Sequence, residues 1–205
     1  MKTLWLVRHS MSQAQTGEGG GLDSDLTEHG RIQAERLVSV LAGACFDIAF
    51  LSPLLRARRT FELSQARAGQ VQFDSRLVEC SYGHSYASLL PYHTPDYGQP
   101  DKEQAWDEPI GLRLKQFVAD LREAPGERFL ILGHWAYFSL LGQHLLGQEQ
   151  LSDPFAGETQ HSLFMDNAAV SRVGLDYERY GDVILQWNVR DHLAGLLSGK
   201  HTLEG

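Results

Sequence analysis

The stretch Thr3–Ser10, TLWLVRHS, is a short apolar run that ends at an arginine and a histidine. Residues 4–7 have the pattern of a strand buried on both faces, and polar residues begin where that strand would end. In an open α/β sheet, ligands bind at the carboxyl ends of the strands. Arg8 and His9 are therefore candidate site residues, a planar cation beside a nitrogen nucleophile. A single strand end does not distinguish a site from a solvated edge.

The same pattern recurs twice further along the chain. Residues 47–51, DIAFL, precede a polar cluster that begins at Ser52, and residues 128–132, RFLIL, precede Gly133 and His134. Further strands are predicted at 71–73, 170–175 and 183–189, and helices at 27–43, after Pro53, at 106–123 and at 137–146. This alternation predicts an α/β fold, a three-layer sandwich with a mostly parallel central sheet flanked by helices on both faces. The three strand ends would then lie on the same side.

Two local features of the predicted helices bear on a site. Thr27 is a natural N-cap for the helix at 27–43, whose apolar stripe includes Ile32. Pro53 suits the first turn of the next helix, where free backbone amides favour an anion. The three arginines of that helix point in different directions, so we expect one to serve a site and the others to be solvated. They are Arg56, Arg58 and Arg59.

Composition limits the classes of function. The chain has 205 residues, 42% of them hydrophobic and 21% charged, which predicts a single globular domain over residues 1–205. Residues 80–108 are rich in proline and aromatics and are predicted to form a lid or insertion segment. The net charge of -8 argues against nucleic-acid partners and against polybasic attachment to a membrane.

The sequence also predicts where the protein works. The first strand begins almost at Met1, and no apolar run approaches the length of a membrane span. We therefore expect no signal peptide and a cytoplasmic location. Two cysteines, Cys45 and Cys80, do not form a disulfide framework, and Cys45 is predicted to be a small core residue. The oligomeric state is open.

Two histidines, two arginines and a carboxylate at one site suit phosphoryl transfer. Arginine binds phosphoryl oxygens bidentately and stays charged at any physiological pH. A histidine nitrogen can attack phosphorus to form a phosphohistidine, which divides one difficult displacement into two. A nearby carboxylic acid can supply the proton that the leaving oxygen needs.

Six segments carry these residue types along the chain. They are RHS at 8–10 with Ser12 and Gln15, LTEHGRIQA at 26–34, SPLLRA at 52–57 with Thr60, LVE at 77–79 with Tyr82-Gly83, Gly133-His134, and NAAVS at 167–171. In this order they resemble the motifs of the histidine phosphatase superfamily, which includes cofactor-dependent phosphoglycerate mutases. The resemblance spans most of the chain.

The resemblance implies a role for each matching residue. His9 is implied to be the nucleophile, and Glu79 the general acid that later activates water. The phosphoryl group would be bound by Arg8, Arg56 and His134, with Ser12 and Gln15 beside it. It also implies no cofactor and no metal, and a small phosphorylated substrate. His9 would need a neutral nucleophilic nitrogen, so its other ring nitrogen should bond an acceptor, whereas His134 beside a phosphate dianion should favour its charged form.

The resemblance leaves three functional hypotheses. The first is a metal-independent phosphomonoester hydrolase that acts through a phosphohistidine. The alternatives are a phosphoglycerate mutase-type phosphotransferase and a non-catalytic member that binds a phosphorylated ligand. Lys102 is the only lysine or arginine in residues 80–108, which favours the phosphatase over a mutase. Ser10 and Trp135 stand where glycine is common in the family, and they favour the non-catalytic hypothesis. A metal hydrolase is poorly supported, because no histidine pair has metal-ligand spacing.

Overall fold

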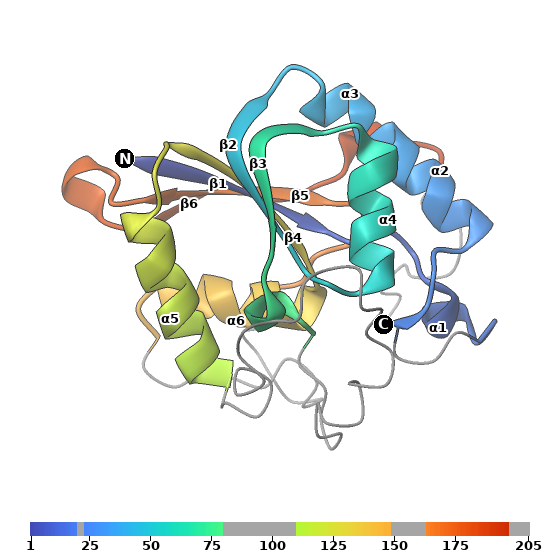
Figure 1. Ribbon diagram of the computed structural model, residues 1–205, viewed down its shortest axis with the longest axis horizontal. Coiled ribbons are helices and arrows are strands. Elements are labelled where there is room, and N and C mark those ends of the chain that lie inside the picture. The colour runs from blue at the N-terminus through green and yellow to red at the C-terminus, as the bar shows by residue number, and fades with distance from the viewer. Residues whose placement is uncertain (20–22, 80–109, 149–162, 197–205) are drawn as a thin grey trace.

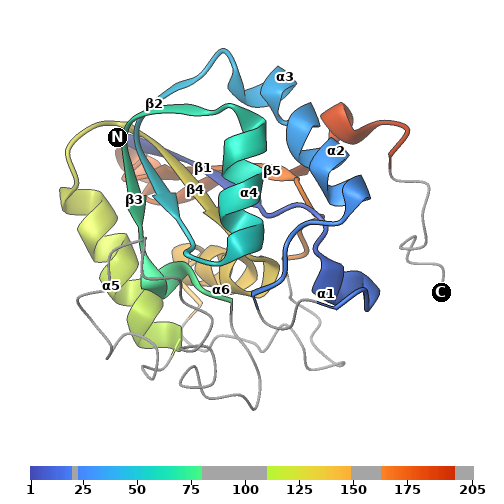
Figure 2. The ribbon, with the colours of Figure 1, turned by 45° about the vertical axis from the view of Figure 1, so that its right-hand side comes forward.

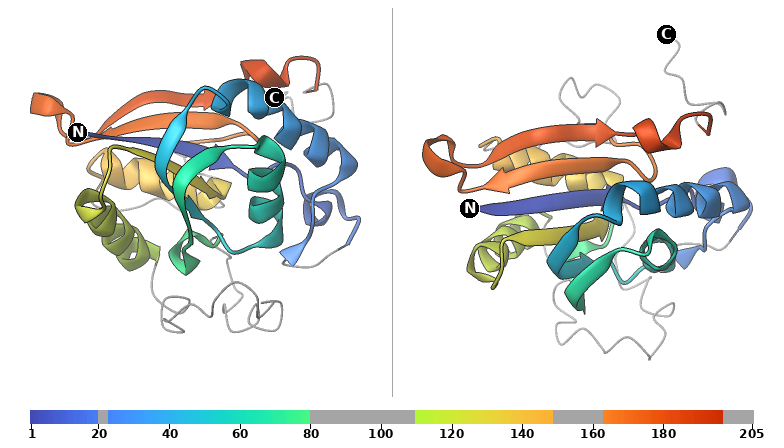
Figure 3. Two further views of the ribbon diagram at one scale, coloured as in Figure 1. Left: turned by 45° about the horizontal axis from the view of Figure 1, so that its top comes forward. Right: turned by 90° about the horizontal axis from the view of Figure 1, so that it is seen from above.

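The computed structural model describes residues 1–19, 23–79, 110–148 and 163–196, and within them the chain forms a six-stranded sheet (Figure 1). The strand order is β3-β2-β4-β1-β5-β6, which the right-hand view of Figure 3 follows from β6 to β3. The strands are β1 (Lys2–Arg8), β2 (Cys45–Leu51), β3 (Arg67–Phe73), β4 (Arg128–Gly133), β5 (Val170–Leu175) and β6 (Val183–Val189).

Helices cover both faces of this sheet. Figure 1 shows α2 (Glu28–Arg36) and α3 (Val38–Leu41) above it, and α5 (Ile110–Glu123) and α6 (Trp135–Leu145) below it. Figure 2 shows α4 (Leu55–Ser64) beside α2, and the short α1 (Gln13–Thr16) lies near the end of β1. Single turns of 3₁₀ helix occur at Ser75–Leu77, Glu178–Tyr180 and Asp191–Leu193.

The buried strands divide their side chains between two cores. Leu4 and Leu6 of β1 pack with α5 and α6, whereas Val7 packs with α3, with α4 and with Leu37 before α3. β4 alternates in the same way, because successive side chains of a strand point to opposite faces. The predicted three-layer α/β architecture is therefore confirmed. The sheet is mostly parallel, with antiparallel pairing only where β5 meets β1 and β6.

Three parallel strand ends meet at one edge of the sheet. β4 lies between β1 and β2, with Arg8 paired to Gly133 and Leu51 paired to Leu132. The residues that follow these ends come together because neighbouring parallel strands stop at the same level. The predicted convergence is confirmed.

Several local predictions need correction. The helix predicted at 27–43 is two helices with a break at Leu37, although the Thr27 hydroxyl does cap it by accepting the Gly30 N–H at 2.9 Å. Ile32 is 37% exposed, because the buried face of α2 is formed by Gly30, Gln33 and Ala34. Cys45 is exposed at the start of β2, not part of the core.

The helix after Pro53 starts later than predicted. α4 begins at Leu55, whose N–H donates to the Asp23 carboxylate, so this helix start already holds an anion from the chain itself. α6 begins at Trp135, two residues earlier than predicted. The predicted lid at 80–108 and the first residues of the helix predicted at 106–123 lie outside the described residues. The single domain over 1–205 stays a prediction.

Gly30 is required where α2 contacts the loop that follows His9. A Cβ atom at position 30 would lie 2.0 Å from the Met11 carbonyl oxygen. Gly30→Ala is therefore expected to lower the free energy of unfolding by about 3 kcal/mol, since overpacking against backbone forces a shift. Urea unfolding measures the change. The matched control is Gly111→Ala in α5, where a Cβ atom would meet nothing within 4 Å. Equal losses in the two variants would contradict the steric argument.

Candidate active site

Four polar side chains from different elements meet at the edge formed by β2, β4 and β1. His9 follows β1, His134 precedes α6, Arg56 lies in the first turn of α4, and Ser52 follows β2. The rings of His9 and His134 have centroids 5.0 Å apart, and Arg56 Nε lies 3.3 Å from His9 Nε2. The structure thus brings together residues that are far apart in the sequence.

His9 is held in one tautomer. It is 3% exposed, and its Nδ1 lies 2.7 Å from the Ser10 carbonyl oxygen, which can only accept a hydrogen bond. Nδ1 therefore carries the proton, and the lone pair of Nε2 accepts a hydrogen bond from Arg56 Nε–H. This confirms the expected acceptor on the other ring nitrogen. Burial, followed by the charges of Arg56 and Arg8, holds the His9 pKa well below its usual value, so the ring is neutral.

Backbone contacts fix the position of the His9 ring. The His9 N–H donates to the Gly133 carbonyl at 2.9 Å, and the Asn167 amide donates to the His9 carbonyl at 2.9 Å. The next N–H group, that of Ser10, donates to Thr60 Oγ1 at 2.9 Å. The main chain around His9 is thus bonded to β4, to α4 and to the segment before β5, as a preorganised nucleophile requires.

Arg8 reaches the site from the last position of β1. Its Nη1 donates to the Met165 carbonyl at 2.6 Å. Burial lowers the Arg8 pKa to about 10; the carboxylates of Glu79 and Asp166 raise it, and Arg56 lowers it. The guanidinium therefore stays charged at neutral pH.

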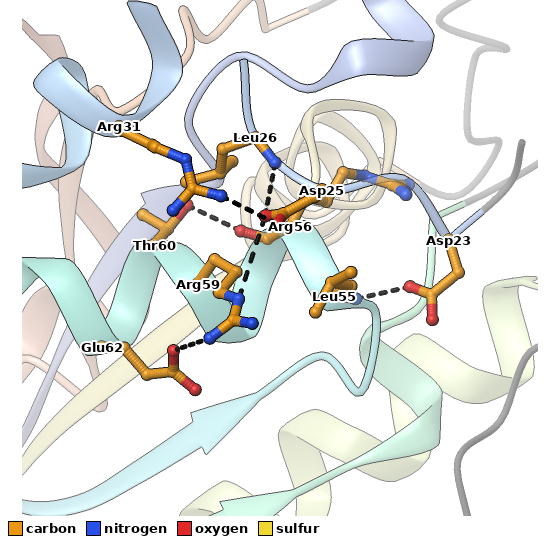
Figure 4. A network of polar contacts seen from close by, with 9 residues as sticks. All are labelled: Asp23, Asp25, Leu26, Arg31, Leu55, Arg56, Arg59, Thr60 and Glu62. Atoms are coloured by element: carbon orange, nitrogen blue, oxygen red, sulfur yellow. Dashed lines mark hydrogen bonds and ion pairs between the residues drawn. The ribbon is translucent and has the colours of Figure 1, made fainter. Parts of the chain in front are cut away.

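A network of polar contacts surrounds Arg56 on α4 (Figure 4). The Thr60 hydroxyl, which accepts from Ser10, donates to the Arg56 carbonyl at 2.7 Å. Asp23 accepts from the Leu55 N–H. Asp25 pairs with Arg31 at 2.9 Å and lies 3.9 Å from Arg59. The loop at 23–26 is thereby attached to α2 and α4 on either side of Arg56.

The two neighbouring arginines differ from each other. Arg59 is exposed and pairs with Glu62 at 2.8 Å, which fits the predicted solvated charge. Arg58 is only 8% exposed, so the prediction that it is solvated is wrong. Its side chain lies on the buried face of α4 that also includes Ala57 and Thr60. A helical position alone did not reveal this, because the packing partners of that face come from elsewhere in the chain.

His134 is fully buried beside Ser52. Its Nε2 lies 2.7 Å from Ser52 Oγ. Burial, then the charges of Arg56, His9, Arg8 and Arg113, lower its pKa well below the usual value. The ring is therefore neutral without a ligand. A bound phosphate dianion would raise the His134 pKa, opposite to the effect of these cations. The charged form of His134 beside a dianion therefore stays a prediction.

The Glu79 side chain contacts the first turn of α6, although Glu79 itself follows the 3₁₀ turn Ser75–Leu77 in the chain. Its Oε1 accepts the Tyr137 N–H at 3.2 Å, in the first turn, where unpaired N–H groups favour a carboxylate. Arg113 of α5, which sequence reasoning missed, is 2% exposed and donates to the Val78 carbonyl at 3.3 Å, one residue before Glu79. The available signal was the position of Arg113 four residues before Phe117, on the apolar face of its helix.

Ser12 and Gln15 form a capping box at α1. The Ser12 N–H donates to Gln15 Oε1 at 3.0 Å, and the Gln15 amide exchanges hydrogen bonds with the Asn167 amide at 3.1 Å. Asn167 in turn donates to the His9 carbonyl. The structure thus places Ser12 and Gln15 next to the loop after His9, and their binding of phosphate stays a prediction.

The two departures from the family pattern are accommodated differently. Ser10 is fully buried, and its N–H group donates to Thr60 Oγ1. The Trp135 ring packs against Phe164, with centroids 5.6 Å apart. Every residue of the predicted site is present despite these two departures.

The electrostatics of the site favour an anion. In the described part of the chain, the buried polar atoms without a hydrogen-bond partner include Arg8 Nε, Ser10 Oγ and His134 Nδ1, which belong to residues in or next to the candidate site. Leaving such atoms unpaired costs about 1–3 kcal/mol each, and a phosphoryl group offers several acceptor oxygens. The described residues contain no cluster of three or more side chains suited to hold a metal ion.

The buried histidines are expected to make the protein less stable in acid. Because the folded pKa values of His9 and His134 lie below the ordinary value of 6.5, the unfolded chain binds more protons once the pH falls below that value. The free energy of unfolding should then decrease by at most about 1.4 kcal/mol per pH unit for each histidine, and these groups contribute no slope well above pH 6.5. Urea unfolding at pH 7.5 and 5.5 measures it. His134→Gln should reduce the slope, and an unchanged slope would contradict the assignment.

Comparisons with known proteins show what the chain is similar to. The family model described as histidine phosphatase superfamily (branch 1) matches residues 4–190. The chain is 28% identical over 195 residues to putative phosphoserine phosphatase 2 of Hydrogenobacter thermophilus, covering 87% of this chain and 92% of that protein. It is 30% identical over 164 residues to the adenosylcobalamin/alpha-ribazole phosphatase of Escherichia coli, covering 70% and 79%. The crystal structure of a putative alpha-ribazole-5'-P phosphatase from Escherichia coli shares the fold, with a TM-score of 0.67, 24% identity and coverage of 92% and 98%.

Proposed function

The chain belongs to the histidine phosphatase superfamily and is a phosphatase, and we propose that it hydrolyses small phosphomonoesters through a phosphohistidine formed on His9. The observation that carries the proposal is the hydrogen bond between His9 Nδ1 and the Ser10 carbonyl. It leaves Nε2 unprotonated beside Arg56, which is the protonation state that attack on phosphorus requires.

In the first step, the Nε2 lone pair of His9 attacks phosphorus and the bond to the leaving oxygen breaks. Arg8, Arg56 and His134 bind the oxygens of the phosphoryl group, and the guanidinium charges stabilise the charge that these oxygens carry. Contacts to Met165, Thr60 and Ser52 support this placement, because they hold these three side chains or their backbone before substrate arrives.

Glu79 handles the proton in both steps. In its acid form it donates a proton to the leaving oxygen as the first bond breaks. The resulting carboxylate then accepts a proton from the water that attacks phosphohistidine, which releases phosphate and restores His9. Its hydrogen bond from the Tyr137 N–H, in the first turn of the helix that follows His134, supports this role.

The remaining properties are proposals of the same kind. The reaction uses no metal or other cofactor, the substrate is a small phosphorylated molecule, and the protein acts in the cytoplasm without nucleic-acid partners. In the described part of the chain, no helix combines the length and apolarity of a membrane span. The names of the relatives, phosphoserine and alpha-ribazole phosphatases, suggest the substrates to assay first.

A panel of phosphomonoesters tests the function. The wild-type protein is assayed with phosphoserine, alpha-ribazole phosphate and aryl phosphates in EDTA, with and without a bisphosphate primer. Release of inorganic phosphate in EDTA without a primer is the expected result. Transfer to a second substrate oxygen that depends on the primer would favour the mutase. Binding of phosphate without turnover of any substrate would favour the non-catalytic alternative, and loss of activity with chelator would remove the metal-free mechanism.

A further inference from the structure

We propose that Asn188, on the edge strand β6, is a positioning residue that aims Arg8 at the phosphoryl group through the segment Met165–Asn167. The inference rests on the proposed function, because it assigns Asn188 a task only if Arg8 binds the transferred group. Asn188 makes no direct contact with Arg8 or His9 among the hydrogen bonds of the described residues, so it acts through the backbone of that segment.

The segment Met165–Asn167 contacts both Arg8 and His9. The Met165 carbonyl accepts from Arg8 Nη1 at 2.6 Å, and the Asn167 amide donates to the His9 carbonyl at 2.9 Å. The N–H group that follows, that of Ala168, donates to the Arg8 carbonyl at 3.1 Å. Any shift of this segment therefore moves the Arg8 guanidinium relative to the His9 ring.

Asn188 holds the middle of this segment with both ends of its amide. Its Oδ1 accepts the Asp166 N–H at 2.8 Å, and its Nδ2 donates to Asp166 Oδ2 at 3.1 Å. Arg190 donates to the same carboxylate oxygen at 2.6 Å. One β6 side chain thus fixes the backbone and the carboxylate of Asp166, the residue next to the carbonyl that binds Arg8.

The backbone of β6 is bent to present this amide. Between the pairs Arg172–Gln186 and Val170–Val189, two residues of β6, Trp187 and Asn188, oppose the single residue Ser171 of β5. Asn188 has a left-handed φ of 54°, which asparagine tolerates better than most residues, and its N–H donates to Ser171 Oγ at 3.0 Å. A bulge of this kind re-aims a side chain, here away from the strand and toward Asp166.

A second contact from the bulge reaches the same segment. Trp187 Nε1 donates to the Phe164 carbonyl at 2.7 Å, one residue before Met165. Neighbouring bulge residues therefore bind residues 164 and 166, on either side of the carbonyl that Arg8 uses. The carbonyl is held from both sides, which is the arrangement expected of a support for a site residue.

Asn188→Gly tests the inference, because glycine keeps the left-handed backbone and removes only the amide. The probe is inorganic phosphate, whose binding is measured by calorimetry and by competitive inhibition of aryl phosphate hydrolysis. We expect about a tenfold weaker binding of phosphate and a similar rise in KM, with kcat less affected. The matched control is Gln186→Ala on the same strand, whose side chain bonds Arg172 at 2.8 Å, and it should bind phosphate like the wild type.

A double-mutant comparison separates positioning from a general loss of structure. In an Arg8→Ala background, Asn188→Gly should change phosphate binding less than twofold, because the side chain that it positions is gone. If Asn188→Gly lowers only the thermal midpoint and leaves phosphate binding and KM unchanged, the inference is overturned. A full tenfold loss in the Arg8→Ala background would overturn it as well. Asn188→Asp, which removes the Nδ2 donor and sets a carboxylate beside Asp166, should reproduce the loss if the glycine variant fails to fold.

The proposed function fails in a different way. If the wild-type protein neither hydrolyses phosphomonoesters nor binds phosphate, both the proposed function and the role of Asn188 are wrong. If the wild type does both and Asn188→Gly matches it in each assay, only the role of Asn188 is wrong.

Discussion

His9→Ala is expected to lower kcat/KM for every phosphomonoester substrate by on the order of 10⁴-fold or more. The expectation follows from the covalent route: the variant removes Nε2 of His9, the proposed nucleophile beside Arg56, and the arginines can bind the phosphoryl group but cannot divide the displacement into two steps. Phosphate binding should fall much less, because Arg8 and Arg56 remain. Steady-state kinetics and phosphate calorimetry measure the two effects.

The control for this variant is His29→Ala, which removes a histidine from the first turn of α2. It should retain kcat/KM within about twofold, as substitutions away from a site usually do. Retention of more than a tenth of wild-type turnover by His9→Ala would remove His9 from the nucleophilic role.

Glu79→Gln should reduce kcat/KM by about 10²–10⁴-fold for alkyl phosphates, whose leaving oxygens need a proton, and far less for aryl phosphates with good leaving groups. Glutamine has the same shape and can still accept the Tyr137 N–H, so the change removes the acid and little else. The measurement is the dependence of log kcat/KM on leaving-group pKa across a substrate series. The slope should become steeper in the variant than in the wild type.

The carboxylate control for this series is Glu62→Gln, since Glu62 is an exposed partner of Arg59 on α4. Its slope should match the wild type. An equal loss by Glu79→Gln for good and poor leaving groups would count against proton donation, and would indicate that Glu79 only supports the fold around His134.

The sequence predicted the parts of the fold that depend on local pattern. β5 and β6 have the predicted bounds, because apolar residues stand at both ends of each segment. The apolar runs before His9, Ser52 and His134 predicted strands that end at one edge, and the parallel order of β1, β4 and β2 places them there. These features need only neighbouring residues to be recognised.

The contacts that shape the site could not be predicted in this way. Ser52 and His134 are 82 positions apart, and Ser10 and Thr60 are 50 apart, so their hydrogen bonds exist only once the sheet and α4 have formed. Burial of Arg58 on α4 depends likewise on distant partners. The sequence indicated which residue types are needed, whereas the tautomer of His9 follows from the three-dimensional structure.

The most direct test of the central claim is to trap the phosphoenzyme during the first turnover. An aryl phosphate with a good leaving group is mixed rapidly with excess protein and quenched in base, which preserves phosphohistidine, and the phosphate is located by mass spectrometry. The account predicts one phosphate on His9, formed at least as fast as the steady-state turnover and absent from His9→Ala. Phosphate on another side chain, or full release of phosphate in the first turnover with no protein-bound intermediate, would contradict it.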